Sequence, residues 1–171
     1  KQTDPEAVLI GEVWEDASNK ISYGVPREYL CGQEIDSAMN YPFRKIVLDF
    51  LLGYVDAMQT RRRMESLREN YPKHNFYAMM NLLDSHDTTR LLSYLDGIDD
   101  DRKQKDLKSA FPTYENTSDT AKQMQYEAAL LQFTYPGAPT VYYGDEMGAV
   151  GADDPDDRRT INWGHGNEDL V

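Results

Sequence analysis

The chain has 171 residues, of which 40% are hydrophobic and 28% are charged, so it can bury a core and is not a disordered segment. Its formal net charge is −12, so nucleic acid and an anionic membrane surface are not expected partners, because both attract clustered Lys and Arg. The apolar runs are far shorter than the roughly 20 residues of a membrane-spanning helix, and the single Cys31 leaves no internal disulfide and no Cys/His cluster for zinc.

The first predicted element is a strand over Ala7–Trp14, a β-branched run that ends near a Gly-Glu pair, as a buried parallel strand does. Residues 15–35 contain Gly, Pro and polar residues and are predicted to form a long loop. A second strand is predicted at Ile35–Tyr41. Pro42 then suits the first turn of a helix, and apolar residues recur at helical spacing as far as Tyr71.

The middle of the chain carries a third predicted strand at Asn75–Leu83, followed by the polar segment Asp84–Arg90. Before it, the run 61–63 of three arginines is interpreted as a solvated helix face. A short helix is predicted to end at Leu95. The acidic loop Asp96–Asp101 does not match a calcium-binding loop, because its carboxylates do not alternate and its glycine comes second.

A helix is predicted over Asp119–Phe133, with Met124, Ala128, Leu131 and Tyr135 on one apolar face. A fourth strand is predicted at 139–143. Strands that alternate with helices indicate an α/β fold with parallel strands and crossover helices. Two architectures fit this order, part of a (β/α) barrel or an open doubly wound sheet. No Gly-x-Gly-x-x-Gly follows a strand, which argues against a nucleotide enzyme.

Carboxylates stand at the ends of three predicted strands. Glu12 follows the first, His86 and Asp87 follow the third, and Asp145 with Glu146 follows the fourth. In parallel barrels, the side chains at the carboxyl ends of strands meet at the catalytic face. Paired carboxylates suit glycosidic cleavage, because one acid protonates the leaving oxygen while another stabilises positive charge at the sugar carbon.

Two side chains close in sequence to these carboxylates are also suited to binding a sugar. Trp14 is either an apolar wall that stacks on a sugar ring or a core residue. His86 can donate hydrogen bonds to sugar hydroxyls.

Five segments together resemble the α-amylase family of glycoside hydrolases, in its neopullulanase, cyclomaltodextrinase and maltogenic amylase branch. They occur in the family's order and cover nearly the whole chain, from about residue 7 to 165. In this sequence they are Gly11–Ser18, Ala38–Arg44, Asn81–Arg90, Gly137–Glu146 and Asp154–Arg158, the last followed by Trp163. They are similar to the segments that follow strands five to eight of the family's barrel and to the donor side of its cleft.

The resemblance implies a role for each matching residue. Glu12 would be the general acid and base, and Asp87 would stabilise the oxocarbenium-like transition state. His86 would bind the same sugar hydroxyls, and Asp154 and Arg158 would hold sugars on the donor side, with an ion pair between them. The implied substrates are α-1,4 and also α-1,6 glucan oligosaccharides or cyclodextrins, and no cofactor or metal ligand is expected among these residues.

The sequence also departs from the family. Relatives often carry His or a neutral polar residue where Glu15 stands, which affects the acceptor side of the cleft. The family's nucleophile, an Asp in an Arg-x-Asp motif after strand four, has no match anywhere in the chain. Residues 1–171 are therefore expected to form the C-terminal half of a partial TIM-type (β/α)8 barrel, strands five to eight with their helices, and to be inactive without the N-terminal half.

Three further expectations follow from the sequence. Open strand edges would favour pairing with a second copy of the chain. The sequence leaves the localisation open, and the lone Cys31 gives only a weak lean to the cytoplasm. The alternative function is a non-catalytic glycan-binding or interaction domain that keeps the barrel; the joint occurrence of Glu12, His86 and Asp87 favours the enzyme.

Overall fold

The structure is a computed structural model that describes residues 3–32, 34–98, 113–161 and 163. It divides into two compact units: a first unit of residues 1–82 and 134–140, and a second unit of residues 83–133 and 141–171. The predicted acidic loop at 96–101 lies mostly outside the described residues. Within the described part of the chain, no helix combines the length and the apolar character needed to cross a membrane.

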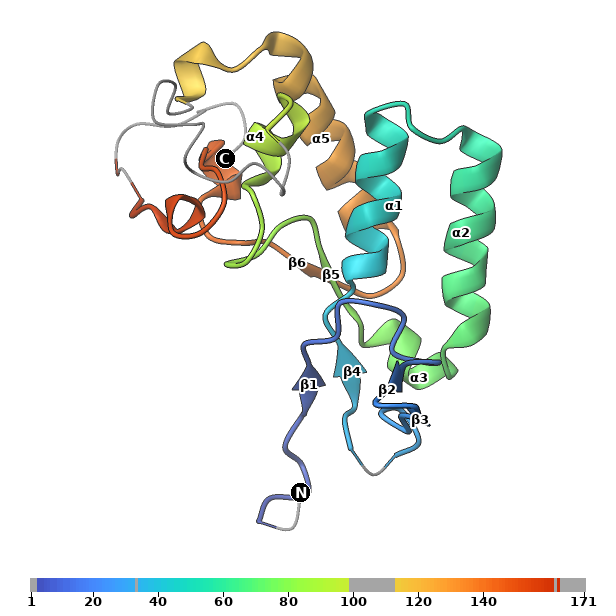
Figure 1. The fold of residues 1–171 in the computed structure, drawn as a ribbon. Coiled ribbons are helices and arrows are strands. Elements are labelled where there is room, and N and C mark those ends of the chain that lie inside the picture. Colours follow the sequence, from blue (N-terminus) through green and yellow to red (C-terminus); the bar gives the residue numbers. More distant parts are fainter. Residues whose placement is uncertain (1–2, 33, 99–112, 162, 164–171) are drawn as a thin grey trace. The chain divides into compact units, whose positions relative to one another are not determined.

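Four short parallel strands form the frame of the first unit. β1 (Ile10–Gly11) pairs with β4 (Ser37–Ala38), and β5 (Met80–Leu82) pairs with β6 (Ala138–Thr140). A parallel bridge between Met39 and Met80 joins the two pairs, so the strands follow one another in space as they do in sequence (Figure 1). A doubly wound sheet reverses its strand order at a switch point, whereas a barrel adds strands consecutively. The observed order favours the barrel.

The first strand is shorter and more exposed than the sequence predicts. The expected buried run over 7–14 contributes only β1, and Val8 and Ile10 are 70% and 45% exposed. The physical reason is that β1, among the described residues, pairs with a neighbour on one side only. The burial expected of a strand with neighbours on both sides is therefore wrong here.

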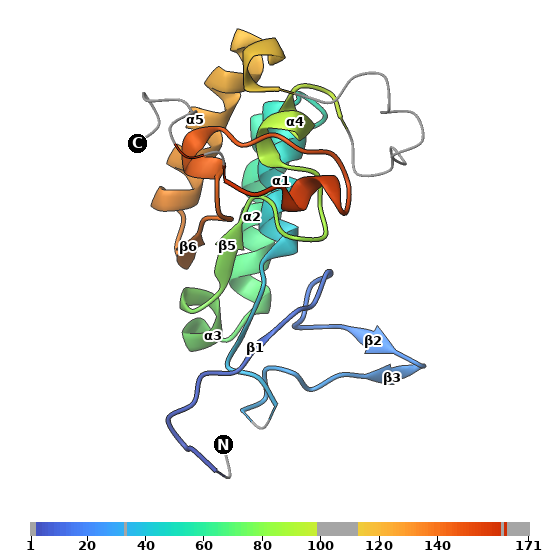
Figure 2. The same ribbon diagram turned by 90° about the vertical axis from the view of Figure 1, so that its left-hand side faces the viewer.

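The predicted loop over 15–35 contains a small antiparallel hairpin that was not predicted. Its strands are β2 (Ile21–Ser22) and β3 (Val25–Pro26), and Figure 2 shows it extending beyond β1. Tyr23 and Gly24, which join them, both have positive φ, as the central residues of a type I′ turn do.

Three helices follow β4 in the first unit: α1 (Tyr41–Leu51), α2 (Ala57–Asn70) and α3 (Lys73–Tyr77). The prediction that Pro42 lies in the first turn of a helix is confirmed. The predicted strand at 75–83 is wrong over 75–77, which are helical, and right over β5.

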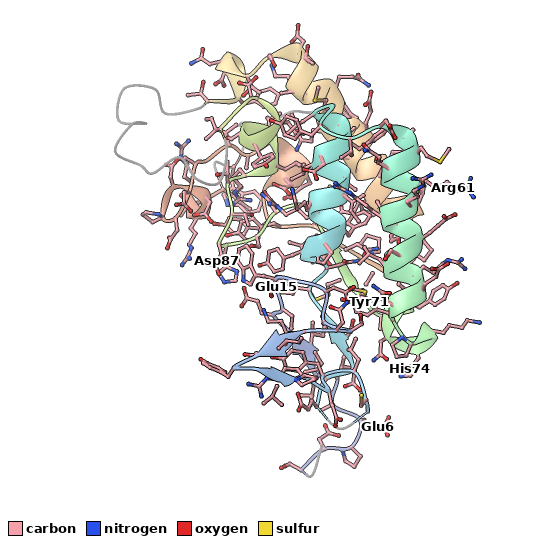
Figure 3. The ribbon with its side chains drawn as sticks, turned by 45° about the vertical axis from the view of Figure 1, so that its right-hand side comes forward. Glu6, Glu15, Arg61, Tyr71, His74 and Asp87 are labelled. Atoms are coloured by element: carbon pink, nitrogen blue, oxygen red, sulfur yellow. The ribbon has the colours of Figure 1, made fainter. Side chains whose placement is uncertain are left out.

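Helices α1 and α2 lie side by side (Figure 1), joined by an ion pair of 2.7 Å between Arg63 Nη1 and Asp49 Oδ2. The three arginines at 61–63 are exposed, as predicted, and Arg61 lies on the side of α2 away from α1 (Figure 3).

A buried pair of asparagines ties the strands to α1. Asn40 Nδ2 donates to Asn81 Oδ1 at 2.8 Å, and Asn81 Nδ2 donates to the carbonyl of Pro136 at 3.1 Å. Asn40 Oδ1 also accepts from the backbone N–H of Phe43 and so caps the first turn of α1. A Cβ at Gly137 would lie 2.5 Å from Asn81 Nδ2, so only glycine allows the backbone at 137 to pack this closely against the asparagine pair.

The core of the first unit packs the first loop, β4 and helices α1 to α3 together. Its aromatic part includes Phe43, which stacks on Tyr135 at 5.1 Å between ring centroids, and Phe76, which meets the same ring edge-on. The buried cluster consists of Val13, Ala17, Leu30, Ala38, Ile46, Leu67, Tyr71, Phe76 and Met79.

The second unit contains α4 (Leu91–Leu95), α5 (Asp119–Thr134) and three 3-10 turns, η1 (Tyr114–Asn116), η2 (Asp145–Met147) and η3 (Asp156–Arg158). Both α-helices were predicted. The predicted face of α5 is right at Ala128, but Met124 and Leu131 are only half-buried, so the buried face is shifted around the helix. The residues that α5 buries are Ala121, Gln125, Ala128 and Gln132. The buried face is partly polar because Gln125 Nε2 donates to the carbonyl of Asp145 at 3.0 Å.

Candidate active site

Glu12 comes directly after β1 and is exposed. Its Oε1 accepts a hydrogen bond of 3.3 Å from the hydroxyl of Tyr41, the first residue of α1. Tyr41 is 4% exposed, so a buried donor from the next strand–helix connection fixes one side of the carboxylate.

Trp14 is 47% exposed, so its ring is not fully buried in the core. Its ring stacks on Tyr41 with 4.1 Å between centroids and 11° between planes. Val13, the residue before it, is buried in the core. A half-exposed indole next to a carboxylate has the geometry of a platform for a sugar ring.

The loop after Trp14 is fixed to the end of α2. The Tyr71 hydroxyl accepts from the backbone N–H of Ala17 at 2.7 Å, and Asn70 Nδ2 donates to Asp16 Oδ2 at 2.8 Å. Figure 3 shows Tyr71 at the end of α2. Burial, reinforced by the charge of Asp16, raises the pKa of Tyr71 well above its ordinary value, so it stays a neutral hydroxyl.

Glu15, the departure from the family pattern, forms an ion pair with Lys20. The hydrogen bond from Lys20 lowers the pKa of Glu15 below its ordinary value, although burial acts in the opposite direction. Glu15 remains ionised and is paired within its own loop.

In the second unit, Arg158 joins the other predicted site residues. Its Nη2 donates to Asp87 Oδ1 at 3.0 Å, and its Nε lies 3.2 Å from Asp154 Oδ1, so the expected ion pair between Asp154 and Arg158 is present. Arg158 Nε also donates to the carbonyl of His86 at 2.8 Å. His86 Nε2 lies 3.4 Å from Asp87 Oδ2. All four side chains are exposed, and Figure 3 shows Asp87 on its loop.

Asp145, the acid after the fourth predicted strand, has a different environment. Burial and the neighbouring Asp84 raise the pKa of Asp145 well above its ordinary value. Asp84 itself caps α4, since its Oδ2 accepts from the backbone N–H of Leu91 at 2.9 Å. Asp145 Oδ1 lies 3.6 Å from Arg90 Nη1. Asp145 is thus a buried carboxyl inside the second unit, beside Asp84 and Arg90, and is not an open catalytic acid.

Sequence reasoning missed Tyr41 as a site residue and left Arg90 out of the site residues, although its short offset from Asp87 suggested that it orients Asp87 or packs under it. Tyr41 stands in the segment Ala38–Arg44 that carried the resemblance, where it was assigned only to a strand end. Arg90 closes the segment Asn81–Arg90 and is 1% exposed. The sequence signal for Arg90 is its short offset from His86 and Asp87, whereas its burial is visible only in the structure.

Comparisons with known proteins agree with this geometry. The family described as "Alpha amylase, catalytic domain" matches residues 1–169. The chain is 41% identical over 181 residues to an amylopullulanase of Thermoanaerobacterium thermosulfurigenes, covering 97% of this chain and 8% of that protein. It is 38% identical over 164 residues to a cyclomaltodextrinase of a Bacillus species, covering 95% of this chain and 24% of that protein.

Solved structures give the same result. A cyclomaltodextrinase structure matches with a TM-score of 0.71 at 34% identity, covering 99% of this chain and 24% of that one. The type III pullulan hydrolase from Thermococcus kodakarensis matches with a TM-score of 0.79 at 28% identity, covering 99% of this chain and 26% of that one. The chain therefore spans between 8% and 26% of the length of these relatives.

The resemblance to the neopullulanase, cyclomaltodextrinase and maltogenic amylase branch is confirmed, and amylopullulanases share it. The fold is part of an α-amylase-type barrel domain. This chain belongs to the α-amylase catalytic domain family of glycoside hydrolases.

Proposed function

We propose that residues 1–171 are the C-terminal half of the catalytic (β/α)8 domain of a retaining glycoside hydrolase, with β1, β4, β5 and β6 as strands five to eight. The observation that carries the proposal is the consecutive parallel order of these strands, with Glu12 after the first and His86-Asp87 after the third. Carboxyl ends of barrel strands are where such enzymes place their catalytic groups.

Glu12 and Asp87 take the two carboxylate roles. Glu12 protonates the leaving oxygen and then activates water, while the Tyr41 hydroxyl orients its carboxylate. Asp87 is exposed and pairs with Arg158, so it can bind ring hydroxyls and face the positive charge that develops at the sugar carbon. This division of roles follows the family pattern, in which two carboxylates act on one glycosidic bond.

The other residues bind sugar. Trp14 offers a half-exposed ring for stacking, and His86 donates a hydrogen bond to the sugar that Asp87 holds. Asp154 and Arg158 bind sugars on the donor side. The substrates proposed are α-1,4 and α-1,6 glucan oligosaccharides and cyclodextrins, as the names of the relatives suggest.

The nucleophile must come from chain outside these residues. A retaining mechanism forms a covalent glycosyl-enzyme intermediate on a carboxylate, and no Arg-x-Asp motif occurs in this sequence. Residues 1–171 alone are therefore proposed to be inactive, and the N-terminal half of the barrel is the partner that they need.

The test is the substitution Glu12→Gln in the full-length protein, assayed with cyclodextrin and maltooligosaccharides. Loss of the general acid should lower kcat by about 10²–10⁴-fold. Glu6→Gln is the matched control, because Glu6 is an exposed glutamate before β1, and it should keep wild-type turnover. Unchanged turnover in Glu12→Gln would remove Glu12 from its role. Glycan binding without any turnover in the wild type would instead favour the non-catalytic alternative.

A further inference from the structure

Arg90 is a buried cation at the centre of the second unit, and the proposed chemistry does not use it. It is 1% exposed, and its guanidinium lies 4.1 Å and 4.5 Å from the ring centroids of Tyr142 and Tyr143. Asp145 Oδ1 lies 3.6 Å from its Nη1. A buried charge that makes this many contacts is costly to place and is retained where its geometry is needed.

The hydrogen bonds of Arg90 join three separate segments. Its backbone N–H donates to the carbonyl of Gly151 at 3.1 Å, its Nε donates to the carbonyl of Asp157 at 2.6 Å, and its Nη1 donates to the carbonyl of Tyr143 at 2.5 Å. The side chain thus holds the loop after β6 and the turn η3 to the segment that carries His86 and Asp87.

These contacts connect Arg90 to Asp87 by two routes, one through Arg158 and one along the backbone. Asp157, whose carbonyl Arg90 holds, directly precedes Arg158, and Arg158 binds Asp87 Oδ1 and the carbonyl of His86. The chain then returns from Asp87 to Arg90 through two buried threonines. The position of Arg158 relative to Asp87 depends on where η3 is held.

We propose that Arg90 is a positioning residue, which fixes η3 so that Arg158 orients Asp87 for the distorted sugar. The inference rests on the proposed function of Asp87. A guanidinium can meet two carbonyls in one plane and stack on rings at the same time, whereas a lysine ammonium is a single point charge on a flexible stem. A lysine at position 90 would keep a positive charge near Asp145, but it would not keep the two hydrogen bonds to the carbonyls of Tyr143 and Asp157.

The test is a double-mutant cycle in the full-length protein with Arg90→Lys and Arg158→Ala, read as kcat/KM on a maltooligosaccharide. Arg90→Lys alone should lower kcat/KM by about 10–100-fold, as small misplacements of catalytic groups do. In the Arg158→Ala background the same change should cost less than about threefold, because the group that Arg90 positions is already absent. Equal losses in both backgrounds would overturn the proposal.

A second variant provides the same test in case the Arg90→Lys protein does not fold. Tyr142→Leu removes one ring from the guanidinium and leaves Arg90 in place, and it should show a smaller loss with the same dependence on Arg158. A loss that is independent of Arg158 would contradict the proposal.

Ser93→Ala is the structural control. It removes a different buried bond of the second unit, the one that Ser93 Oγ accepts from the backbone N–H of Gly151. It should lower the melting temperature with little change in kcat/KM. Arg90 effects that follow melting temperature in the same way as Ser93→Ala would reduce Arg90 to a structural role. The Glu12→Gln assay judges the proposed function separately, since its outcome does not depend on η3.

Discussion

At the scale of single residues, the most unusual group in the second unit is the carboxylate of Asp157. It is fully buried, and neither oxygen has a hydrogen-bond partner among the described residues. Burial raises the pKa of Asp157 from 3.8 to about 6; Arg158 opposes the rise and Asp154 adds to it. The folded protein therefore binds this proton more tightly than the unfolded chain does.

The first prediction concerns the pH dependence of stability. A raised folded-state pKa gives stability that is complete below about pH 4 and is lost as the pH rises through about 6. Asp157→Asn has no charge to bury, so between pH 4 and 7 it should lose about 2 kcal/mol less unfolding free energy than the wild type. Denaturant unfolding of the full-length protein at several pH values measures this. Parallel pH curves for the two proteins would contradict it.

The second prediction concerns Gly137, whose φ is +135° and whose missing Cβ would overlap Asn81 Nδ2 at 2.5 Å. Gly137→Ala should destabilise the protein by about 1–3 kcal/mol, because the asparagine pair must move or the backbone must distort. Gly53→Ala is the matched control: Gly53 also has a positive φ, +74°, but a Cβ there meets nothing within 4 Å. Thermal unfolding should show the larger loss for Gly137→Ala. Equal losses of stability in the two variants would show that the positive φ, and not the overlap with Asn81, accounts for the whole effect.

The candidate site was predictable where its residues stand in short segments at strand ends. Glu12 directly follows β1, and His86 and Asp87 come four and five residues after the end of β5. All three are exposed, and acids near strand ends are visible in one sequence. The contact of Arg90 with the carbonyl of Asp157 was not predictable, because it joins backbone and side chain across 67 positions. Sequence patterns indicate which residues are present but not which carbonyl a buried arginine reaches.

At the scale of elements, helices were predicted best where local signals and packing agree. Pro42 marks the first turn of α1 and the apolar spacing continues through it. The short helix α3 was missed because its aromatic residues favour a strand. There, tertiary contact outweighs local preference: Asn75 Nδ2 donates to the carbonyl of Asp36 at 2.6 Å, and Phe76 is buried.

The third prediction concerns the start of α2. Asp56 Oδ1 accepts from the backbone N–H of Gln59 at 2.7 Å, and Gln59 Oε1 accepts from the backbone N–H of Asp56 at 3.1 Å, which is a capping box. Asp56→Ala should cost about 1 kcal/mol of stability, because it leaves a helix N–H without its cap, whereas Asp56→Ser should retain most of it. Thermal unfolding compares the two variants, and equal midpoints would show that the cap does not matter.

At the scale of the whole molecule, the strand order explains both the success of the fold prediction and its main error. Alternating strands and helices indicated parallel strands, and the consecutive order β1, β4, β5, β6 agrees with a barrel. The error lies in the predicted strand over 7–14, where Val8 and Ile10 are exposed. Sequence composition cannot distinguish an edge strand from an inner strand when both are rich in β-branched residues.

The last prediction concerns a polypeptide of residues 1–171 produced alone. Because β1 and β6 each pair on one side only among the described residues, their free edges should recruit a second copy, and cyclodextrin should not be hydrolysed. Sedimentation velocity should show self-association that Ile10→Lys weakens, because a charge on an edge strand opposes pairing. Tyr54→Lys is the control, since Tyr54 is 71% exposed beyond the end of α1 and belongs to no edge. A stable monomer, or hydrolysis by this polypeptide alone, would contradict the assignment of these residues to half of a catalytic barrel.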